Sequence, residues 1–181
     1  PDGEPENGTS RTADPAVRFQ AEQALRMARA YAAEKLPWFA PALFAARLVL
    51  AENCPGLAAI DGGMRAYFNP AIVAELVRRE EPRRALVELA WVWVHEISHL
   101  LRDHRDRACE RNAEAFRWNV AADLEINDAS WSDLEPPRGW PPLLPDAFQM
   151  PTGQLAEYYY QHLPPQWEDQ VRAQNLFFSD E

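Results

Sequence analysis

Cysteine is scarce in this chain, and its two copies follow no C-x-x-C pattern. Cys54 and Cys109 lie far apart among the 181 residues. A disulfide is therefore not indicated, and a reducing compartment is the default for such a chain. We expect a cytoplasmic protein.

Long apolar runs and a surplus of positive charge are missing as well. No apolar run approaches the length of a membrane-spanning helix. The net charge is −10 at pH 7, and the pI is near 4.9. A surface of this sign is repelled by nucleic acids and by anionic membranes, so we expect neither of them as the main partner.

The length and composition fit one folded domain with polar ends. Hydrophobic residues make up 47% of the chain, which is enough for a core. Residues 1–13 are polar and contain Gly and Pro, so we expect a disordered lead-in there. The domain is expected over residues 14–165, and the weakly patterned residues 166–181 are expected to form a C-terminal tail.

Most of the domain carries helix signals, and several helices have a clear start. Asp14-Pro15 and Asn69-Pro70 each place a good N-cap residue before a proline, which suits the first helical position. Glu81-Pro82 opens a further helix. Residues 131–151, which are rich in Pro and Trp, predict an irregular but ordered loop. Helices are expected over residues 15–35, 41–50, 70–79, 82–102, 107–128 and 152–163.

Residues 57–68 carry the pattern of a β-hairpin. Two short apolar strands flank Asp61-Gly62-Gly63, which suits a tight turn. The expected fold class is therefore α+β and predominantly helical. We expect the hairpin, or a small sheet that contains it, to pack on the helix over residues 82–102.

That helix carries the run His95-Glu96-Ile97-Ser98-His99, an H-E-x-x-H motif. Two histidines four apart lie about 40° apart around a helix, so one face offers two nitrogens to one metal ion. Glu96 lies one step round the same surface, where it can reach a water bound to that metal without binding the metal itself. The pattern predicts zinc as the cofactor and Glu96 as the catalytic residue.

The surroundings of the motif favour a metal site over a chance match. The chain has four histidines, and three of them fall between positions 95 and 104. From Val92 to Leu101 every residue outside the motif is uncharged, as a buried zinc-binding helix requires, because a stray charge would cost desolvation energy. The alternative is a core helix whose two histidines are satisfied by the protein.

A catalytic zinc site usually has three protein ligands, and the third has two candidates here. On an unbroken helix His104 would point about 140–180° away from the motif, so it can join only if the helix ends and the chain turns back. Asp123 is the favoured candidate. If His104 is the ligand instead, we expect Asp123 to orient an imidazole.

Asp123 is favoured because it belongs to a polar stripe on an otherwise apolar helix. Asn119, Asp123 and Asn127 are spaced i, i+4 and i+8, and such a stripe in a buried helix needs partners. We expect Asn119 and Asn127 to support the metal ligands. The alternative is that the stripe is simply solvated.

Residues 58–163 resemble a known family. The most particular segment is Trp118–Asn127, which reads W-N-x-A-x-D-x-x-I-N, and the H-E-x-x-H run, His104 and residues 59–61, 67–70 and 156–159 also contribute. The stretch is similar to the bacterial metallopeptidase domain that occurs beside von Willebrand factor A-like domains. That family often has Gly before the position of His104, where this chain has Asp103.

The resemblance implies a zincin-like α+β domain that binds zinc through His95, His99 and a third group, with a von Willebrand-like domain as a partner. We therefore expect a zinc-dependent hydrolase, specifically a peptidase, whose substrate is a peptide or protein. The alternative is a non-catalytic zinc-binding module that partners the von Willebrand-like domain. Candidates for stabilising the oxyanion of the reaction are Arg105, Tyr158, Tyr159 and His162.

Overall fold

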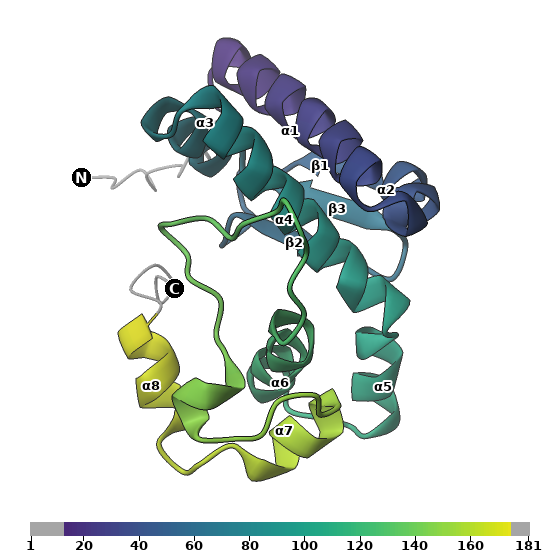
Figure 1. The fold of residues 1–181 in the computed structure, drawn as a ribbon, viewed down its shortest axis with the longest axis vertical. Coiled ribbons are helices and arrows are strands. Elements are labelled where there is room, and N and C mark those ends of the chain that lie inside the picture. The colour runs from purple at the N-terminus through teal and green to yellow at the C-terminus, as the bar shows by residue number, and fades with distance from the viewer. Residues whose placement is uncertain (1–12, 175–181) are drawn as a thin grey trace, which may run out of the picture.

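The computed structural model describes residues 13–174, which are mostly helical (Figure 1). The expected lead-in over residues 1–13 lies, except for its last residue, outside this range. The α+β, predominantly helical class is confirmed. No helix within residues 13–174 is long and apolar enough to span a bilayer. The elements in chain order are α1 (Pro15–Lys35), the 3-10 helix η1 (Pro37–Phe39), α2 (Ala40–Ala45), β1 (Arg47–Leu50), β2 (Ala58–Ile60), β3 (Arg65–Phe68), α3 (Pro70–Arg79), α4 (Pro82–Leu101), α5 (His104–Glu110), α6 (Ala115–Asn127), the 3-10 helix η2 (Pro145–Phe148), α7 (Ala156–His162) and α8 (Trp167–Gln174).

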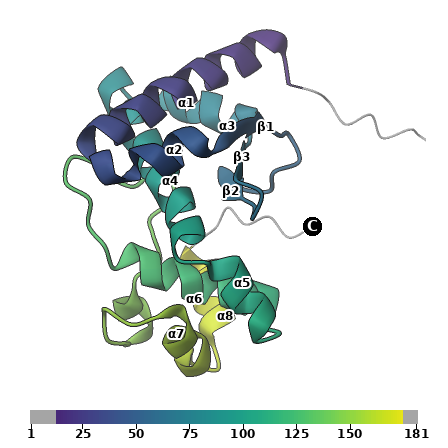
Figure 2. The ribbon, with the colours of Figure 1, turned by 90° about the vertical axis from the view of Figure 1, so that its right-hand side faces the viewer.

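The chain folds into two halves stacked along its long axis (Figures 1 and 2). The N-terminal half (residues 13–101) holds α1 to α4 and the sheet, and the C-terminal half (residues 102–174) holds α5 to α8. Helix α4 runs from the first half toward the second, where α5 follows it. The loop between α6 and α7 contacts both cores, because its Leu134 packs in the first core and its Leu143 in the second.

The helix starts that capping residues predicted are confirmed. The side chain of Asp14 accepts a hydrogen bond from the N–H of Ala16 at the start of α1, over 2.9 Å. At the start of α3, Oδ1 of Asn69 accepts from the N–H groups of Ala71 and Ile72. These bonds satisfy amides that the first turn of a helix otherwise leaves unpaired.

Three strands form the sheet, in the order β1-β3-β2. The predicted hairpin is confirmed, with β2 antiparallel to β3. The helix expected over residues 41–50 is wrong in its second half, because Arg47–Leu50 forms β1 and pairs parallel with β3, Val49 opposite Tyr67. A short apolar run suits a strand as well as a helix, and here the pairing partner lies further along the chain.

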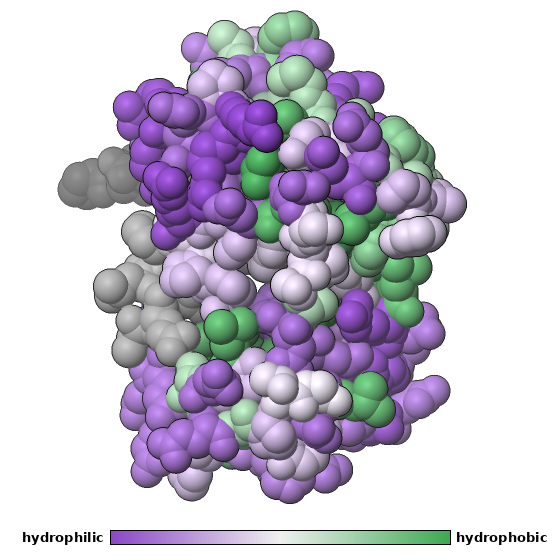
Figure 3. All heavy atoms as spheres, viewed as in Figure 1, coloured by the Kyte–Doolittle hydropathy of each residue, from purple (hydrophilic) through white to green (hydrophobic). Residues whose placement is uncertain are grey.

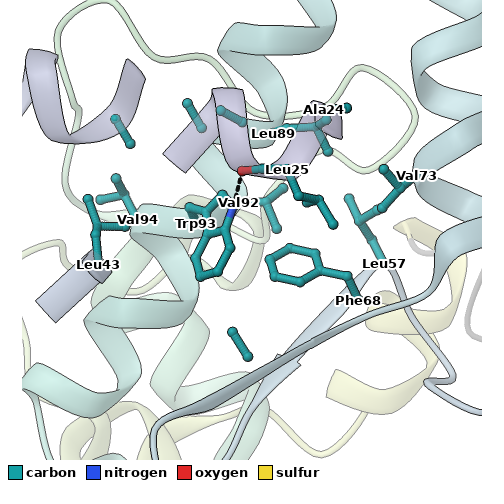
Figure 4. Packing of buried hydrophobic residues seen from close by; sticks show 14 of the residues in the cluster. Ala24, Leu25, Leu43, Leu57, Phe68, Val73, Leu89, Val92, Trp93 and Val94 are labelled. Carbon is teal, nitrogen blue, oxygen red and sulfur yellow. Dashed lines mark hydrogen bonds between the residues drawn. The ribbon is translucent and has the colours of Figure 1, made fainter. Parts of the chain in front are cut away.

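The first core fills the N-terminal half around α4. Trp93 is fully buried, and its indole N–H donates a hydrogen bond to the backbone carbonyl of Leu25 in α1, over 3.0 Å (Figure 4). The ring of Phe68 in β3 lies 4.8 Å from the ring of Trp93, between centroids. Helix α1, helix α4 and the sheet thus share one aromatic centre, which holds the middle of α4 in place.

The single helix expected over residues 107–128 is wrong, because two helices occupy this stretch. Helix α5 ends at Glu110, and Asn112 adopts a left-handed conformation with a φ of 47°. Glu114 then caps α6 by accepting hydrogen bonds from the N–H groups of Phe116 and Arg117. The chain turns at this point, so α6 packs back toward α4.

The second core lies between α6, α7 and α8. Trp118 and Tyr159 are among its buried side chains. The stretch expected as a tail, residues 166–181, includes α8, whose Trp167 and Val171 are buried in this core, and its residues after 174 lie outside the described range. Polar side chains cover most of the face seen in Figure 3, and apolar ones are scattered over both halves.

Candidate metal centre

The C-terminal end of α4 and the middle of α6 pack together at the interface between the two halves. His95 and His99 come from α4, and Asp123 comes from α6. The Nε2 atoms of the two imidazoles are 3.3 Å apart. Oδ1 of Asp123 lies 3.4 Å from Nε2 of His95 and 3.2 Å from Nε2 of His99. The two Nε2 atoms and Oδ1 of Asp123 therefore form a small triangle at this interface.

The size of this triangle suits a zinc ion. Tetrahedral zinc bonds to imidazole nitrogen and carboxylate oxygen measure about 2.0–2.2 Å, which puts two ligand atoms of one ion about 3.3–3.6 Å apart. The observed separations of 3.3, 3.4 and 3.2 Å are close to this spacing. Two imidazoles and a carboxylate are also a donor set typical of catalytic zinc sites. The residues present thus fit the ion that the motif predicts.

Each imidazole of the triangle also contacts an aromatic ring outside the triangle. The ring of Trp91 stacks on His95, with centroids 5.0 Å apart and 21° between the planes. Nδ1 of His99 lies 3.0 Å from Nδ1 of His104. Sequence reasoning missed Trp91, although its position one helical turn before His95 is a signal that could have found it.

Charge and burial set the protonation of the triangle. Burial disfavours the charged imidazole of His95, but contact with Asp123 outweighs it and raises the pKa of His95. For His99, burial and repulsion from the neighbouring imidazoles outweigh the contact with Asp123, so the pKa of His99 is lowered. Burial acts against the charge of Asp123, yet the two imidazoles hold its pKa well below the ordinary value. Asp123 is thus kept charged and His99 neutral, the forms that a metal ion binds.

Glu96 is a buried carboxylate beside the triangle. Its side chain makes no hydrogen bond or ion pair with any residue in the range 13–174, and it lines a cavity. Only 8% of the residue is exposed. Burial raises the pKa of Glu96 to about 7, with Asp123 acting in the same direction and His95 against it. Because the carboxylate faces the cavity, its oxygens are open to a hydrogen-bond partner there rather than to one from the protein.

His104 turns back toward α4 because that helix ends at Leu101. Asp103 adopts a left-handed conformation with a φ of 51°, at the position where the resembling family often has Gly. Aspartate is one of the few other residues that visit this conformation. The ring of His104 is buried behind His99, outside the triangle. The structure therefore brings Asp123, and not His104, into contact with both imidazoles of the motif.

The polar stripe on α6 has three different surroundings. Asp123 joins the triangle, whereas Asn119 is exposed on the wall of the cavity. Asn127 donates a hydrogen bond through Nδ2 to the carbonyl of Leu143, over 2.9 Å, and its side chain also helps to raise the pKa of His95. Asn119 is thus exposed, whereas Asp123 and Asn127 are half-buried.

A cavity of about 480 Å³ opens at the triangle. One part of its wall is β2 with its flanking residues, from Pro55 to Gly62, and another part is the proline-rich loop around Trp140. Strand β2 lies at the edge of the sheet. Ligand pockets typically measure about 300–1,000 Å³, so the cavity can take a small ligand or a few residues of a peptide.

Of the four candidates for the oxyanion donor, Arg105 alone lines this cavity. A Cβ on Gly62 would come within 2.5 Å of Nη1 of Arg105, so the arginine crosses the hairpin turn where the absence of a side chain leaves room. Tyr159 is buried in the second core. Tyr158 and His162 stack on each other on α7, with centroids 4.1 Å apart.

Glu125 is a residue of the site that sequence patterns did not single out. Its Oε2 lies 3.3 Å from Nε2 of His104 and 3.0 Å from Nη2 of Arg107, and it accepts a 2.7 Å hydrogen bond from the N–H of Ala156. These partners come from α5 and α7, so no spacing within α6 could have revealed them. Burial favours the neutral acid, but the three neighbours lower the pKa of Glu125 to about 2.

The fold and the site define a small α+β domain with a candidate metal centre in a cavity. The chain matches the family described as "Putative metallopeptidase domain" over residues 20–167, and it belongs to that family. The expected likeness to a metallopeptidase is confirmed at this level. Neither the curated proteins nor the solved structures yielded a match.

Proposed function

We propose that this protein is a zinc-dependent peptidase in which His95, His99 and Asp123 hold the metal and Glu96 is the catalytic base. The observation that carries the proposal is Glu96, a buried carboxylate without a protein partner in residues 13–174. It faces the same cavity as the three converging donors. A core helix with satisfied histidines would not need such a group, and membership in the metallopeptidase family supports the proposal independently.

The donor set supports zinc and the choice of the third ligand. When bound, zinc supplies Lewis-acid chemistry, making a water molecule more acidic and polarising a carbonyl group. Magnesium and calcium prefer sites built from oxygen alone, whereas imidazole suits zinc. Asp123 is the proposed third ligand because one of its oxygens lies within 3.4 Å of both Nε2 atoms. We propose that Asn127 steadies His95 from outside the triangle and that Asn119 contacts the substrate.

The carboxylate of Glu96 performs the proton transfers in this proposal. It lies beside the triangle without belonging to it, so its oxygens remain available to a water molecule in the cavity. The carboxylate accepts a proton as the water attacks the substrate carbonyl. The resulting acid then donates that proton to the amine that leaves when the peptide bond breaks.

An extended peptide is the proposed substrate. Strand β2 is at the edge of the sheet and lines the cavity, so its outward backbone groups support pairing with a peptide strand. Arg105 lines the same cavity and is the proposed donor to the oxyanion that forms on the substrate carbonyl. A positive charge at this point favours the transition state over the neutral ground state.

The variant Glu96→Gln tests the proposal. We expect cleavage of a broad peptide library to fall about 10²–10⁴-fold, because the general base is lost, while the zinc content stays at the wild-type level. Glu110→Gln is the matched control, since this side chain is 75% exposed on α5, and it should cleave like the wild type. Cleavage is measured by mass spectrometry, and zinc by metal analysis of protein purified without a histidine tag.

Three outcomes would contradict parts of the proposal. A wild-type protein without zinc would show that the metal centre is wrong. Zinc binding with equal cleavage by wild type and Glu96→Gln would show that Glu96 is not the base. Zinc binding without cleavage of any library peptide would favour the non-catalytic module that partners a second domain.

A further inference from the structure

We propose that His104 and Glu125 form a positioning chain behind His99, which decides the ring nitrogen that His99 turns toward the metal. The inference rests on the proposed zinc site but assigns a role to two residues outside its ligand set. It follows from three contacts in one line, His99 to His104, His104 to Glu125, and Glu125 to its anchors in α5 and α7.

The first contact joins two imidazoles through the same kind of atom. Nδ1 of His99 and Nδ1 of His104 are 3.0 Å apart, and His104 is 3% exposed. The backbone of His104 is held as well, because the indole N–H of Trp118 donates a 2.8 Å hydrogen bond to its carbonyl. His104 therefore has little freedom to turn its ring elsewhere.

The protons of this chain can be placed by elimination. A neutral imidazole has one N–H, and a metal needs the lone pair of the other nitrogen. Since Nε2 of His99 faces the triangle, its proton belongs on Nδ1, which then donates to Nδ1 of His104. His104 must accept there, so its own proton belongs on Nε2. That nitrogen lies 3.3 Å from Oε2 of Glu125, within ion-pair distance but without the alignment of a hydrogen bond, so a small turn of the ring is needed for the N–H to donate.

Glu125 ends the chain because it is the fixed negative group. Arg107 contacts its Oε2 at 3.0 Å, and the N–H of Ala156 donates to the same oxygen at 2.7 Å. Arg107 is in turn 2.5 Å from Glu157 on α7. The orientation of a ring on α4 is thus determined by a carboxylate on α6 that α5 and α7 hold in place. Hydrogen-bond acceptors behind a ligating imidazole raise metal affinity in other sites by fixing the tautomer and orientation of the ring.

The affinity for zinc alone, measured by competition with a chelator, tests the chain without any substrate. We expect His104→Phe, which keeps a ring but offers no acceptor, to weaken zinc binding about 10–100-fold. His104→Asn places an amide oxygen near the position of Nδ1, so it should recover most of that loss. His162→Phe on the exposed face of α7 is the matched control and should bind zinc like the wild type.

The positions of the protons provide a second, direct readout. In zinc-loaded protein with ¹⁵N-labelled histidine, long-range ¹H–¹⁵N spectra should show His99 protonated on Nδ1 and His104 protonated on Nε2. A proton on Nδ1 of His104 would overturn the proposal, and so would equal zinc affinity in wild type and His104→Phe. If zinc binds and the proton positions are as expected while no peptide is cleaved, the chain stands and only the peptidase function fails. If wild type binds no zinc, both fail.

Discussion

The N-terminal half and the C-terminal half of the molecule are stabilised in different ways. In the N-terminal half, α1, α4 and the sheet pack around Trp93, and the buried side chains are mostly apolar. In the C-terminal half, connected charges flank the apolar core, with Arg107 in contact with both Glu125 and Glu157. Tyr159 adds a 2.7 Å hydrogen bond to Asp128.

The candidate metal centre lies where the two halves meet, and each half contributes different side chains to it. Apolar packing holds α4 in place, so the two imidazoles of the motif are presented together. The charged half supplies Asp123 and, through Glu125, the support of His104. Apolar burial does not depend on pH, whereas ion pairs do. We therefore expect acid to weaken the contacts of Glu125 in the C-terminal half, and ion pairs of the N-terminal half such as Asp61–Arg65 respond to acid as well.

The largest effect should come from the centre of the N-terminal half. Trp93→Ala removes a fully buried ring and its hydrogen bond to Leu25, so we expect the free energy of unfolding to fall by about 3–5 kcal/mol. Urea unfolding followed by circular dichroism measures this loss. Trp38→Ala is the control, because Trp38 is 83% exposed, and it should change the free energy by less than about 0.5 kcal/mol. A loss below about 1 kcal/mol for Trp93→Ala would contradict the importance of this centre.

The next largest effect on the free energy of unfolding should come from zinc, because its proposed ligands belong to both halves. At a free concentration 100 times its dissociation constant, a ligand that binds only the folded state adds about 2.7 kcal/mol to the free energy of unfolding. We expect most of this gain to vanish in Asp123→Asn, although both imidazoles of α4 remain. Thermal unfolding with and without zinc measures it. An equal gain in wild type and Asp123→Asn would remove Asp123 from the ligand set.

The smallest effect should be the acid sensitivity of Glu125. Its pKa is about 2 in the folded chain, below the ordinary value near 4.5, so its charge stabilises the fold above pH 4.5 and this contribution is lost as the pH falls toward 2. Glu125→Gln should cost about 1–2 kcal/mol at pH 7, and the difference from wild type should shrink across this window.

The variant Trp93→Ala in the N-terminal half provides a control for this pH test. The difference between wild type and Trp93→Ala should stay constant from pH 7 to pH 3, because no titrating group is removed. Urea unfolding at several pH values gives both differences from the same set of proteins. A Glu125→Gln difference that does not change with pH would mean that the carboxylate is not held charged by its neighbours.

The helix starts could be predicted because their signals are local. Asp14 and Asn69 cap their helices through atoms two or three residues away, and the hairpin turn is equally short in range. Strand β1 could not be predicted, because its apolar run becomes a strand only by pairing with β3 further along the chain. The end of α5 depends on Asn112, a residue that favours a left-handed turn without requiring one.

The candidate site, too, could be predicted from the sequence only in part. The spacing of His95 and His99 is set by the helical repeat, so the sequence by itself determined that two imidazoles and the neighbouring Glu96 lie near one another on α4. Which further group meets those imidazoles was decided only in the tertiary structure. His104 is nearer in sequence, yet its ring lies behind His99, while Asp123 arrives from another helix. A repeat along one helix fixes positions on that helix alone, and the approach of α6 depends on packing that buries side chains from both halves.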